Sequence, residues 1–223
     1  MGKTTPLSIR DQIYESVKED ILASRYSPGE ELLIDKLATE YGVSTTPIRE
    51  ALLRLTTVGL VVLNPNKGAR VAPINEEYTQ YIFELRLLLE TYAARQTVLQ
   101  APSLDLDGLE QRIKLIRSGV FQQRDYKETD LALHELLYVH LPNVLLKDIM
   151  RNLYELSIRI RYYAQEGRGI NQEIITTAAE EHLAILDSLR SGNVEEVVEA
   201  VRQHIVKSGE RTSRAVSARV PSA

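Results

Sequence analysis

The sequence contains no cysteine, no tryptophan and only two phenylalanines among its 223 residues. The lack of cysteine excludes a disulfide framework and a thiolate metal site. No apolar run approaches the roughly 20 residues that a membrane-spanning helix needs. The first residues, MGKTTPLSIRDQ, lack the apolar core of a signal peptide. We therefore expect a soluble, cytoplasmic protein with an aliphatic, helix-packed core and no membrane partner.

An excess of basic charge is also missing. The 27 lysines and arginines are outnumbered by 31 aspartates and glutamates, which gives a formal net charge of −4. Residues 1–75 are neutral, with nine basic and nine acidic side chains, so the acidic excess lies entirely beyond them. Any attraction of the first part to nucleic acid must come from the local placement of a few basic side chains.

Residues 33–71 have the pattern of two short helices, a tight turn between them, and a following β-hairpin. Pro47 suits the first turn of the second helix, and Thr46 before it is the expected N-cap. Another helix is expected over residues 8–24, and short strands are expected on both sides of the turn-rich tip at residues 64–68. This order predicts a winged helix-turn-helix, whose second helix is shaped to lie in the major groove of DNA.

The start of that second helix is where such a domain meets bases and phosphates. Hydroxyl side chains can bond either group, and the planar fork of Arg49 can grip a guanine or a phosphate. Basic side chains also flank a glycine at the hairpin tip, where backbone can approach a groove closely. A three-helix scaffold used only for protein contacts is the alternative. The residues expected to contact DNA are Lys36, Ser44, Thr45, Thr46, Arg49, Arg54, Lys67, Gly68 and Arg70.

Beyond a linker at residues 73–76, the sequence predicts helices almost exclusively. Their short connections favour antiparallel neighbours in a bundle. The expected fold class is mainly α, with a winged helix-turn-helix domain over residues 8–73 and an antiparallel all-helical bundle over residues 77–212. A disordered tail is expected over residues 213–223, where apolar content is low.

All four histidines lie in the helical part of the chain. Asp130 and His134 are four residues apart and share a helix face, which is a standard way to aim two ligands at one ion. His182 and His204 lie at similar distances from the turn between their helices, so an antiparallel hairpin brings them level. These four side chains can therefore converge on a metal, or they are buried groups that only exchange hydrogen bonds. His140 falls on another face and is interpreted as a surface residue.

The first part of the chain resembles the DNA-binding domain of the GntR family of bacterial transcription regulators. The resemblance covers nearly all of residues 8–73 and implies a DNA-binding regulator. Many members carry arginine directly after the Gly-Val-Ser triplet, where this chain has Thr45. In some members an arginine occupies the position of Asp35, and here only the neighbouring Lys36 is basic. The matching residues are Ser27-Pro28-Gly29, Leu37-Ala38, Gly42-Val43-Ser44, Thr46 to Leu52, Leu55, Gly59-Leu60-Val61 and Gly68.

The second part resembles the FCD ligand-binding domain of the FadR-type branch of the same family, over most of residues 77–206. The matching segments are Glu84-Leu85-Arg86 with Glu90 and Ala93-Ala94, Asp130 to His134 with Asn143, Glu181-His182 with Ile185-Leu186 and Leu189, Gly192-Asn193, and His204. In that family one aspartate and three histidines bind a divalent metal. The resemblance therefore implies a metal site made of Asp130, His134, His182 and His204.

Three imidazoles and a carboxylate suit Zn²⁺, Ni²⁺, Mn²⁺ or Fe²⁺, and zinc is the first expectation. Arg86 resembles a family arginine that faces the ligand cavity, where it can pair with a carboxylate effector. A salt bridge from Arg86 to Glu90, four residues later, is the alternative. Arg159 and Arg161 are weaker candidates for the same effector-binding role.

These features predict a ligand-responsive transcription regulator, expected to be a repressor and not an enzyme. It would bind a pseudo-palindromic operator in double-stranded DNA as a homodimer, with half-sites about one helical turn (~34 Å) apart. A small carboxylate at the metal site would change its affinity for DNA. One alternative is a metal-dependent hydrolase of a small organic acid, although no further Glu or His is clearly placed as a general base. Another is a regulator whose signal is the metal itself.

Thr45 predicts a difference in operator recognition. A bidentate contact between arginine and guanine contributes about 1–3 kcal/mol of discrimination per base pair. We expect Thr45→Arg to tighten binding to a typical operator of the family by a similar amount, measured by titration with labelled duplex. An affinity that does not change on this substitution would contradict the prediction.

Overall fold

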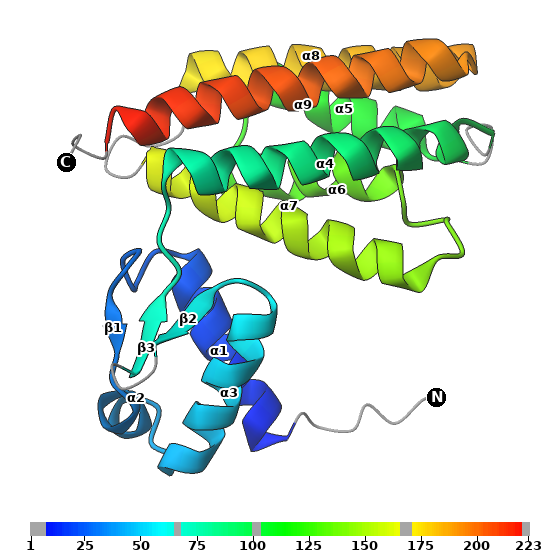
Figure 1. Cartoon of the computed structure of the whole chain (residues 1–223). Helices are drawn as coiled ribbons and strands as arrows, with labels where there is room; N and C mark the ends of the chain where they lie inside the picture. The colour runs from blue at the N-terminus through cyan, green and yellow to red at the C-terminus, as the bar shows by residue number, and fades with distance from the viewer. Residues whose placement is uncertain (1–7, 65–67, 100–103, 166–170, 220–223) are drawn as a thin grey trace. The chain divides into compact units, whose positions relative to one another are not determined.

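The structure is a computed structural model that describes residues 8–64, 68–99, 104–165 and 171–219. The chain forms two compact units, which divide between Ile74 and Asn75 and are described separately below. Figure 1 shows three helices with a small sheet in the first unit and helices in the second. The expected mainly α fold class is confirmed. None of the helices in the described ranges is long and apolar enough to span a bilayer.

The first unit packs three helices and a three-stranded antiparallel sheet around one core. Its elements are α1 (Ile9–Leu22), β1 (Glu31–Leu32), α2 (Ile34–Glu40), α3 (Thr45–Thr57), β2 (Val61–Asn64) and β3 (Gly68–Val71). The strands lie in the order β1-β3-β2. Val17 and Ile21 of α1 and Ile48, Leu52 and Leu55 of α3 are at most 2% exposed. These residues recur at helical spacing, so each helix buries a single apolar face.

Two local features of this unit differ from the sequence analysis. Helix α3 begins at Thr45 with Ser44 as its N-cap, so the expected cap at Thr46 is wrong. Pro47 still lies in the first turn, where a backbone N–H has no intrahelical acceptor and its loss costs little. The two-residue strand β1 was not predicted, because so short a segment carries no periodicity of its own. Its pairing with β3 places Glu31 opposite Arg70.

The second unit is a bundle of helices, and the expected antiparallel all-helical domain is confirmed in this respect. Its elements are α4 (Glu76–Thr97), α5 (Leu106–Arg117), α6 (Gln123–Leu136), α7 (Val144–Ala164), α8 (Gln172–Ser191) and α9 (Val194–Ser217). Asparagine caps begin several of them, since the side chains of Asn75, Asn143, Asn171 and Asn193 each accept a backbone N–H of the following turn. Short polar connections therefore define where these helices start.

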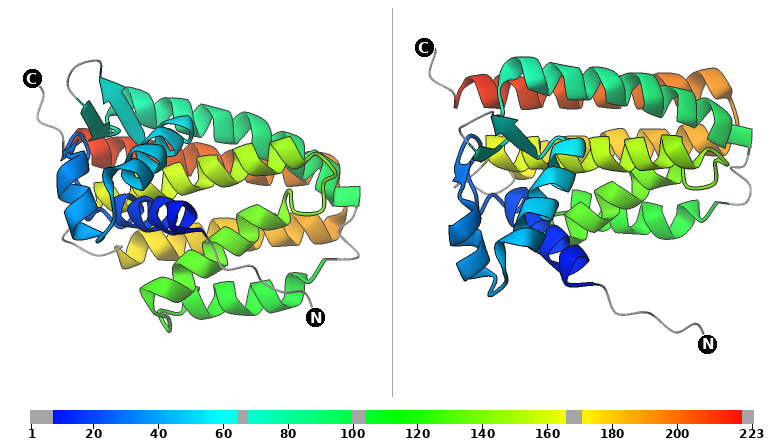
Figure 2. Two further views of the ribbon diagram at one scale, coloured as in Figure 1. Left: turned by 90° about the horizontal axis from the view of Figure 1, so that it is seen from below. Right: turned by 60° about the horizontal axis from the view of Figure 1, so that its bottom comes forward.

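Helix α9 holds the bundle together by packing along two neighbours. Gly192, in the left-handed conformation at φ 69°, ends α8 and allows the chain to turn back as α9. Helices α4 and α9 lie side by side along their length (Figures 1 and 2). Their approach is close at Gly209, where an added Cβ would lie 3.1 Å from the ring of Phe83. This packing brings side chains of α4, α8 and α9 to a common interior.

Helix α9 also corrects the expected tail. It continues to Ser217, so residues 213–217 are helical and not disordered. Ser208, Thr212 and Val216 recur every four residues and are all buried. One apolar or hydroxyl side chain per turn was therefore enough to keep the helix packed, although the segment has few apolar residues.

Candidate functional site

The start of α3 presents polar side chains to solvent, as a DNA-reading helix requires. Ser44, Thr46 and Arg49 are exposed and Thr45 is half-buried, whereas Ile48 is fully buried. Because Ile48 anchors the helix, its polar neighbours are held facing outward. The first-turn N–H groups have no intrahelical acceptors, and they add a partial positive charge that suits phosphate. Lys36 and Gly68 are exposed too, whereas Lys67 lies outside the described residues.

Two other arginines expected to meet DNA already have partners. Arg54 donates to Asp11 over 2.9 Å, and its guanidinium lies 3.9 Å from the centre of the Tyr14 ring. Arg70 forms an ion pair with Glu31 across the β1–β3 pairing. Surface ion pairs contribute about 0–1 kcal/mol, so a phosphate can compete for both arginines. Of the predicted contacts, Arg49 is the arginine that the structure leaves exposed at the helix start.

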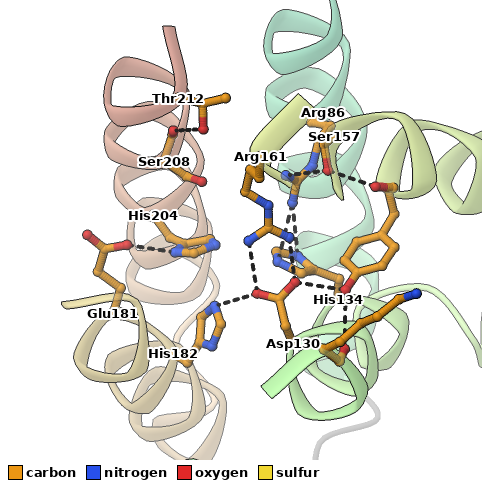
Figure 3. Close-up of polar contacts among 12 residues, drawn as sticks. Arg86, Asp130, His134, Ser157, Arg161, Glu181, His182, His204, Ser208 and Thr212 are labelled. Atoms are coloured by element: carbon orange, nitrogen blue, oxygen red, sulfur yellow. Dashed lines mark hydrogen bonds and ion pairs between the residues drawn. The ribbon is translucent and has the colours of Figure 1, made fainter. Parts of the chain in front are cut away.

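Three histidines meet in the interior of the second unit (Figure 3). His134 comes from α6, His182 from α8 and His204 from α9, and each is at most 2% exposed. One potential ligand atom from each ring lies within 4.8 Å of the other two. The rings of His182 and His204 have centroids 4.7 Å apart, as the expected hairpin register requires. His140 is exposed and does not join them.

Two of these rings have a carboxylate hydrogen-bonded to Nδ1, the ring nitrogen that would face away from a bound ion. Glu90 Oε2 lies 2.7 Å from Nδ1 of His134, and Glu181 Oε2 lies 2.8 Å from Nδ1 of His204. A carboxylate on Nδ1 is the usual outer partner of a metal-binding histidine, because it directs the lone pair of Nε2 toward the ion. Nε2 of His182 and Nε2 of His204 are buried and have no hydrogen-bond partner among the described residues.

Burial keeps these rings in the form that binds metal. It lowers the pKa of His204 to about 4, and it holds the pKa of His182 well below its ordinary value. Both rings are therefore neutral near pH 7 and have a lone pair to donate. The unpartnered nitrogens, the neutral rings and the outer carboxylates together fit a divalent ion.

Asp130, the expected fourth ligand, lies beside the histidines but is already bonded. Its Oδ1 is 3.7 Å from Nε2 of His182. Arg161 donates to both carboxylate oxygens, at 2.6 Å from Nη2 to Oδ2 and 3.3 Å from Nη1 to Oδ1. The hydroxyl of Tyr154 donates to Oδ2 over 2.8 Å. Burial alone would raise the pKa of this carboxyl, but the charge and hydrogen bonds of Arg161 together with the neighbouring imidazoles of His134 and His182 outweigh it and keep the pKa well below its usual range.

Arg86, the predicted effector residue, is 1% exposed and belongs to the same interior. Its Nε donates to Glu90 over 2.6 Å, and its Nη1 donates to Ser157 over 3.1 Å. Its Nη2 lies 3.3 Å from both ring nitrogens of His134, too evenly placed for a directed bond to either. The structure therefore shows the ion pair that was the alternative interpretation of this residue. Its role toward an effector stays a prediction.

The sequence analysis missed two of the ion pairs that support the histidines, Asp130–Arg161 and Glu181–Arg211. Each histidine has a neighbouring carboxylate, and each of these carboxylates is held by an arginine. The three sets are His134 with Glu90 and Arg86, His182 with Asp130 and Arg161, and His204 with Glu181 and Arg211. Arg211 binds Glu181 in a bidentate way, at 2.7 and 2.8 Å. Local spacing signals only the Arg86–Glu90 pair, because the other contacts join separate helices.

A pocket opens next to this cluster, between α6, α7, α8 and α9. Tyr126, Tyr162 and several aliphatic side chains form its walls. Its polar lining comes mainly from Arg161, Arg211 and Ser208, with Thr212 and Gln165 nearby. A pocket with apolar walls and convergent cationic groups suits a small organic anion.

Comparisons with known proteins agree with both halves of this description. Among curated relatives, the Nta operon transcriptional regulator of Aminobacter aminovorans is 31% identical over 189 residues, which cover 82% of this chain and 84% of that protein. The HTH-type transcriptional repressor RspR of Escherichia coli K12 is 25% identical over 204 residues, covering 91% and 88%. Among solved structures, E. coli McbR/YncC shares the fold, with a TM-score of 0.75 at 20% identity, covering 93% of this chain and 98% of that one.

Family matches cover nearly the whole of the two units. Residues 9–71 match the gntR family of bacterial regulatory proteins, and residues 81–207 match the FCD domain. The resemblance noted in the sequence is thus confirmed. The chain belongs to the GntR family of bacterial transcription regulators and carries an FCD domain after its winged helix-turn-helix.

Proposed function

We propose that this regulator is a repressor that binds a pseudo-palindromic operator as a homodimer and responds to a small carboxylate bound at a metal site. The observation that carries the proposal is the buried set of three histidines, which has unpartnered Nε2 atoms next to a cationic pocket. Related proteins named as repressors support the polarity. The same names favour regulation over the hydrolase alternative.

DNA recognition is assigned to the start of α3. Arg49 is exposed there beside hydroxyl side chains, and a helix-turn-helix meets base edges with this part of its second helix. The neutral charge balance of residues 1–75 leaves little general attraction to phosphate. Individual side chains in this turn therefore carry a large share of the binding.

The DNA assignment is tested by selecting genomic fragments with the purified protein and titrating the recovered operator. We expect Arg49→Ala to weaken operator binding by about 1–3 kcal/mol, because a bidentate base contact is lost. Arg112→Ala is the matched control, since Arg112 is exposed on α5 in the other unit, and it should leave the affinity unchanged. Failure to recover any fragment, or equal effects of the two variants, would exclude this assignment.

His134, His182, His204 and Asp130 would hold the ion, through imidazole nitrogens and one carboxylate oxygen. When bound, a divalent ion with open coordination positions supplies an attachment point for an anionic ligand. The chain itself would supply the rest of the binding site. Arg211 and the hydroxyl of Ser208 can donate to a carboxylate, while Tyr126 and Tyr162 cover its apolar part. This composition favours a carboxylate with an apolar body.

The effector assignment is tested by a thermal-shift screen of metal-loaded protein against small organic acids. An acid present at 100 times its Kd should stabilise the protein by about 2.7 kcal/mol and change its affinity for the operator. His182→Ala should abolish both effects, whereas His140→Ala, which alters an exposed histidine outside the cluster, should preserve them. If chelator alone reproduced the full change in operator affinity, the metal itself would be the signal.

The dimer is assigned to the first helix of the FCD domain. On α4, Tyr81, Leu85, Leu88 and Tyr92 are 46–66% exposed and follow one another at spacings of four, three and four residues. This spacing places them in one stripe along the helix. Exposed apolar stripes of this kind usually mark an interface, and a two-fold dimer buries the same stripe of both copies. We assign this stripe to contact with a second copy of the chain, because an operator with two half-sites needs two winged helix-turn-helix domains.

The dimer assignment is tested by light scattering coupled to size exclusion. We expect Leu88→Glu to convert the dimer to a monomer, since it would place a charge at the centre of the buried stripe. Leu115→Glu is the matched control, because Leu115 is 55% exposed on α5 and lies outside the stripe. A dimer that survives Leu88→Glu would show that the chains associate through another surface.

A further inference from the structure

Arg161 differs from the other two arginines of the cluster in where its carboxylate partner lies relative to the neighbouring histidine ring. The carboxylates that Arg86 and Arg211 hold, Glu90 and Glu181, approach Nδ1 atoms, the side of each ring that faces away from a bound ion. Asp130, which Arg161 holds, instead approaches Nε2 of His182. Arg161 is therefore the arginine whose carboxylate partner stands on the ligand side of the cluster (Figure 3).

The guanidinium of Arg161 uses the same oxygens that an ion would need. It donates to both Oδ1 and Oδ2 of Asp130, and Tyr154 takes a further lone pair of Oδ2. An ion bound by His182 and by a carboxylate oxygen lies about 2.0–2.2 Å from each ligand atom. Oδ1 keeps a further lone pair, but an ion and the guanidinium are like charges that would bond the same carboxylate, and they repel in a buried site where screening is weak. A bound ion and Arg161 therefore compete for the negative charge of Asp130.

The fold provides a second position for the displaced side chain. Arg161 also lines the pocket between α6 and α9, with Ser208, Thr212 and Gln165. Oε1 of Gln165 is a buried acceptor without a hydrogen-bond partner in the described part of the chain, and Nε of Arg161 is a buried donor in the same condition. A rotated Arg161 would therefore have an unused acceptor in the pocket to which one of its N–H groups can donate.

We propose that Arg161 is an internal competitor of the metal ion: its guanidinium neutralises the charge of Asp130 and so weakens the binding of an ion to that carboxylate. This inference rests on the metal site proposed above and adds its regulation. Arg161 is a positioning residue that lowers the affinity for metal, so that only an ion above a threshold concentration is retained.

The test is the affinity for Zn²⁺ alone, measured by competition with a chromophoric chelator at constant pH. We expect Arg161→Gln to bind Zn²⁺ about tenfold more tightly than the unaltered protein, a difference of 1.4 kcal/mol. Arg161→Lys keeps the charge but loses the bidentate geometry, so it should fall between the two. Arg211→Gln is the matched control, since it removes a second, partly buried guanidinium that holds a carboxylate on an Nδ1 side, and it should bind Zn²⁺ no more tightly than the unaltered protein.

A purely structural role for Arg161 predicts the opposite sign, because loss of the side chain would disorder Asp130 and weaken Zn²⁺ binding. Equal or weaker binding by Arg161→Gln would therefore overturn the proposal. In a background of Asp130→Asn, Arg161→Gln should no longer change the affinity, since the competition acts through that carboxylate. If Arg161→Gln does not fold in the presence of EDTA, as judged by circular dichroism, Arg161→Lys alone decides the sign.

The Zn²⁺ affinity of the unaltered protein distinguishes a failure of the proposed function from a failure of the proposed competition. If it does not bind Zn²⁺ at all, the metal site of the proposed function is wrong. If it binds Zn²⁺ but Arg161→Gln does not bind more tightly, the metal site stands and only the competition is wrong. As a second readout, the rise in Tm on saturation with Zn²⁺ should be larger for Arg161→Gln than for Arg211→Gln.

Discussion

Charge compensation in the interior of the FCD domain is the constraint on which the rest of this structure depends. Three carboxylates and three arginines surround three buried histidines; Arg86, Glu90 and Asp130 are themselves buried, and an unpaired charge there would cost several kcal/mol. Each carboxylate therefore has a bonded guanidinium. The pairing is strong enough to hold the pKa of Glu90 and of Glu181 at about 2 despite burial, which acts in the opposite direction. Because two of the three pairs join different helices, Asp130 with Arg161 between α6 and α7 and Glu181 with Arg211 between α8 and α9, these helices must stay in register for the charges to cancel.

The bundle supplies this register through contacts that are mostly apolar. Gly192 turns α8 into α9 so that His182 and His204 come level, and Gly209 lets α9 approach Phe83 of α4. Helix α4 carries Arg86 and Glu90 on one face and the exposed stripe of Leu85 and Leu88 on another. In the proposed dimer, the helix that meets the second copy is thus also part of the wall of the histidine cluster.

The sequence predicted those parts of the structure that depend on the local spacing of residues along a helix. Helix spacing predicted the mainly α fold and indicated that Asp130, His134, His182 and His204 can converge, while the expectation that they form a metal site came from the resemblance to the FCD domain. It named Arg161 only as a weaker candidate for effector binding and did not predict its pairing with Asp130 or the Glu181–Arg211 pair, because these contacts join helices whose rotation about their own axes no local pattern fixes. The same limit explains the missed strand β1 and the extra turns of α9, where one buried residue per turn, such as Val216, decides the outcome.

The electrostatic balance of the cluster also indicates what kind of effector it can accept. Three arginine–carboxylate pairs already cancel one another, and His182 and His204 are neutral. A divalent ion would therefore add two positive charges to a site in which the guanidinium groups remain charged. In a medium of low dielectric constant this excess is unfavourable unless negative charge arrives with the ion. The proposed carboxylate effector would supply that charge, so metal and effector should each favour binding of the other.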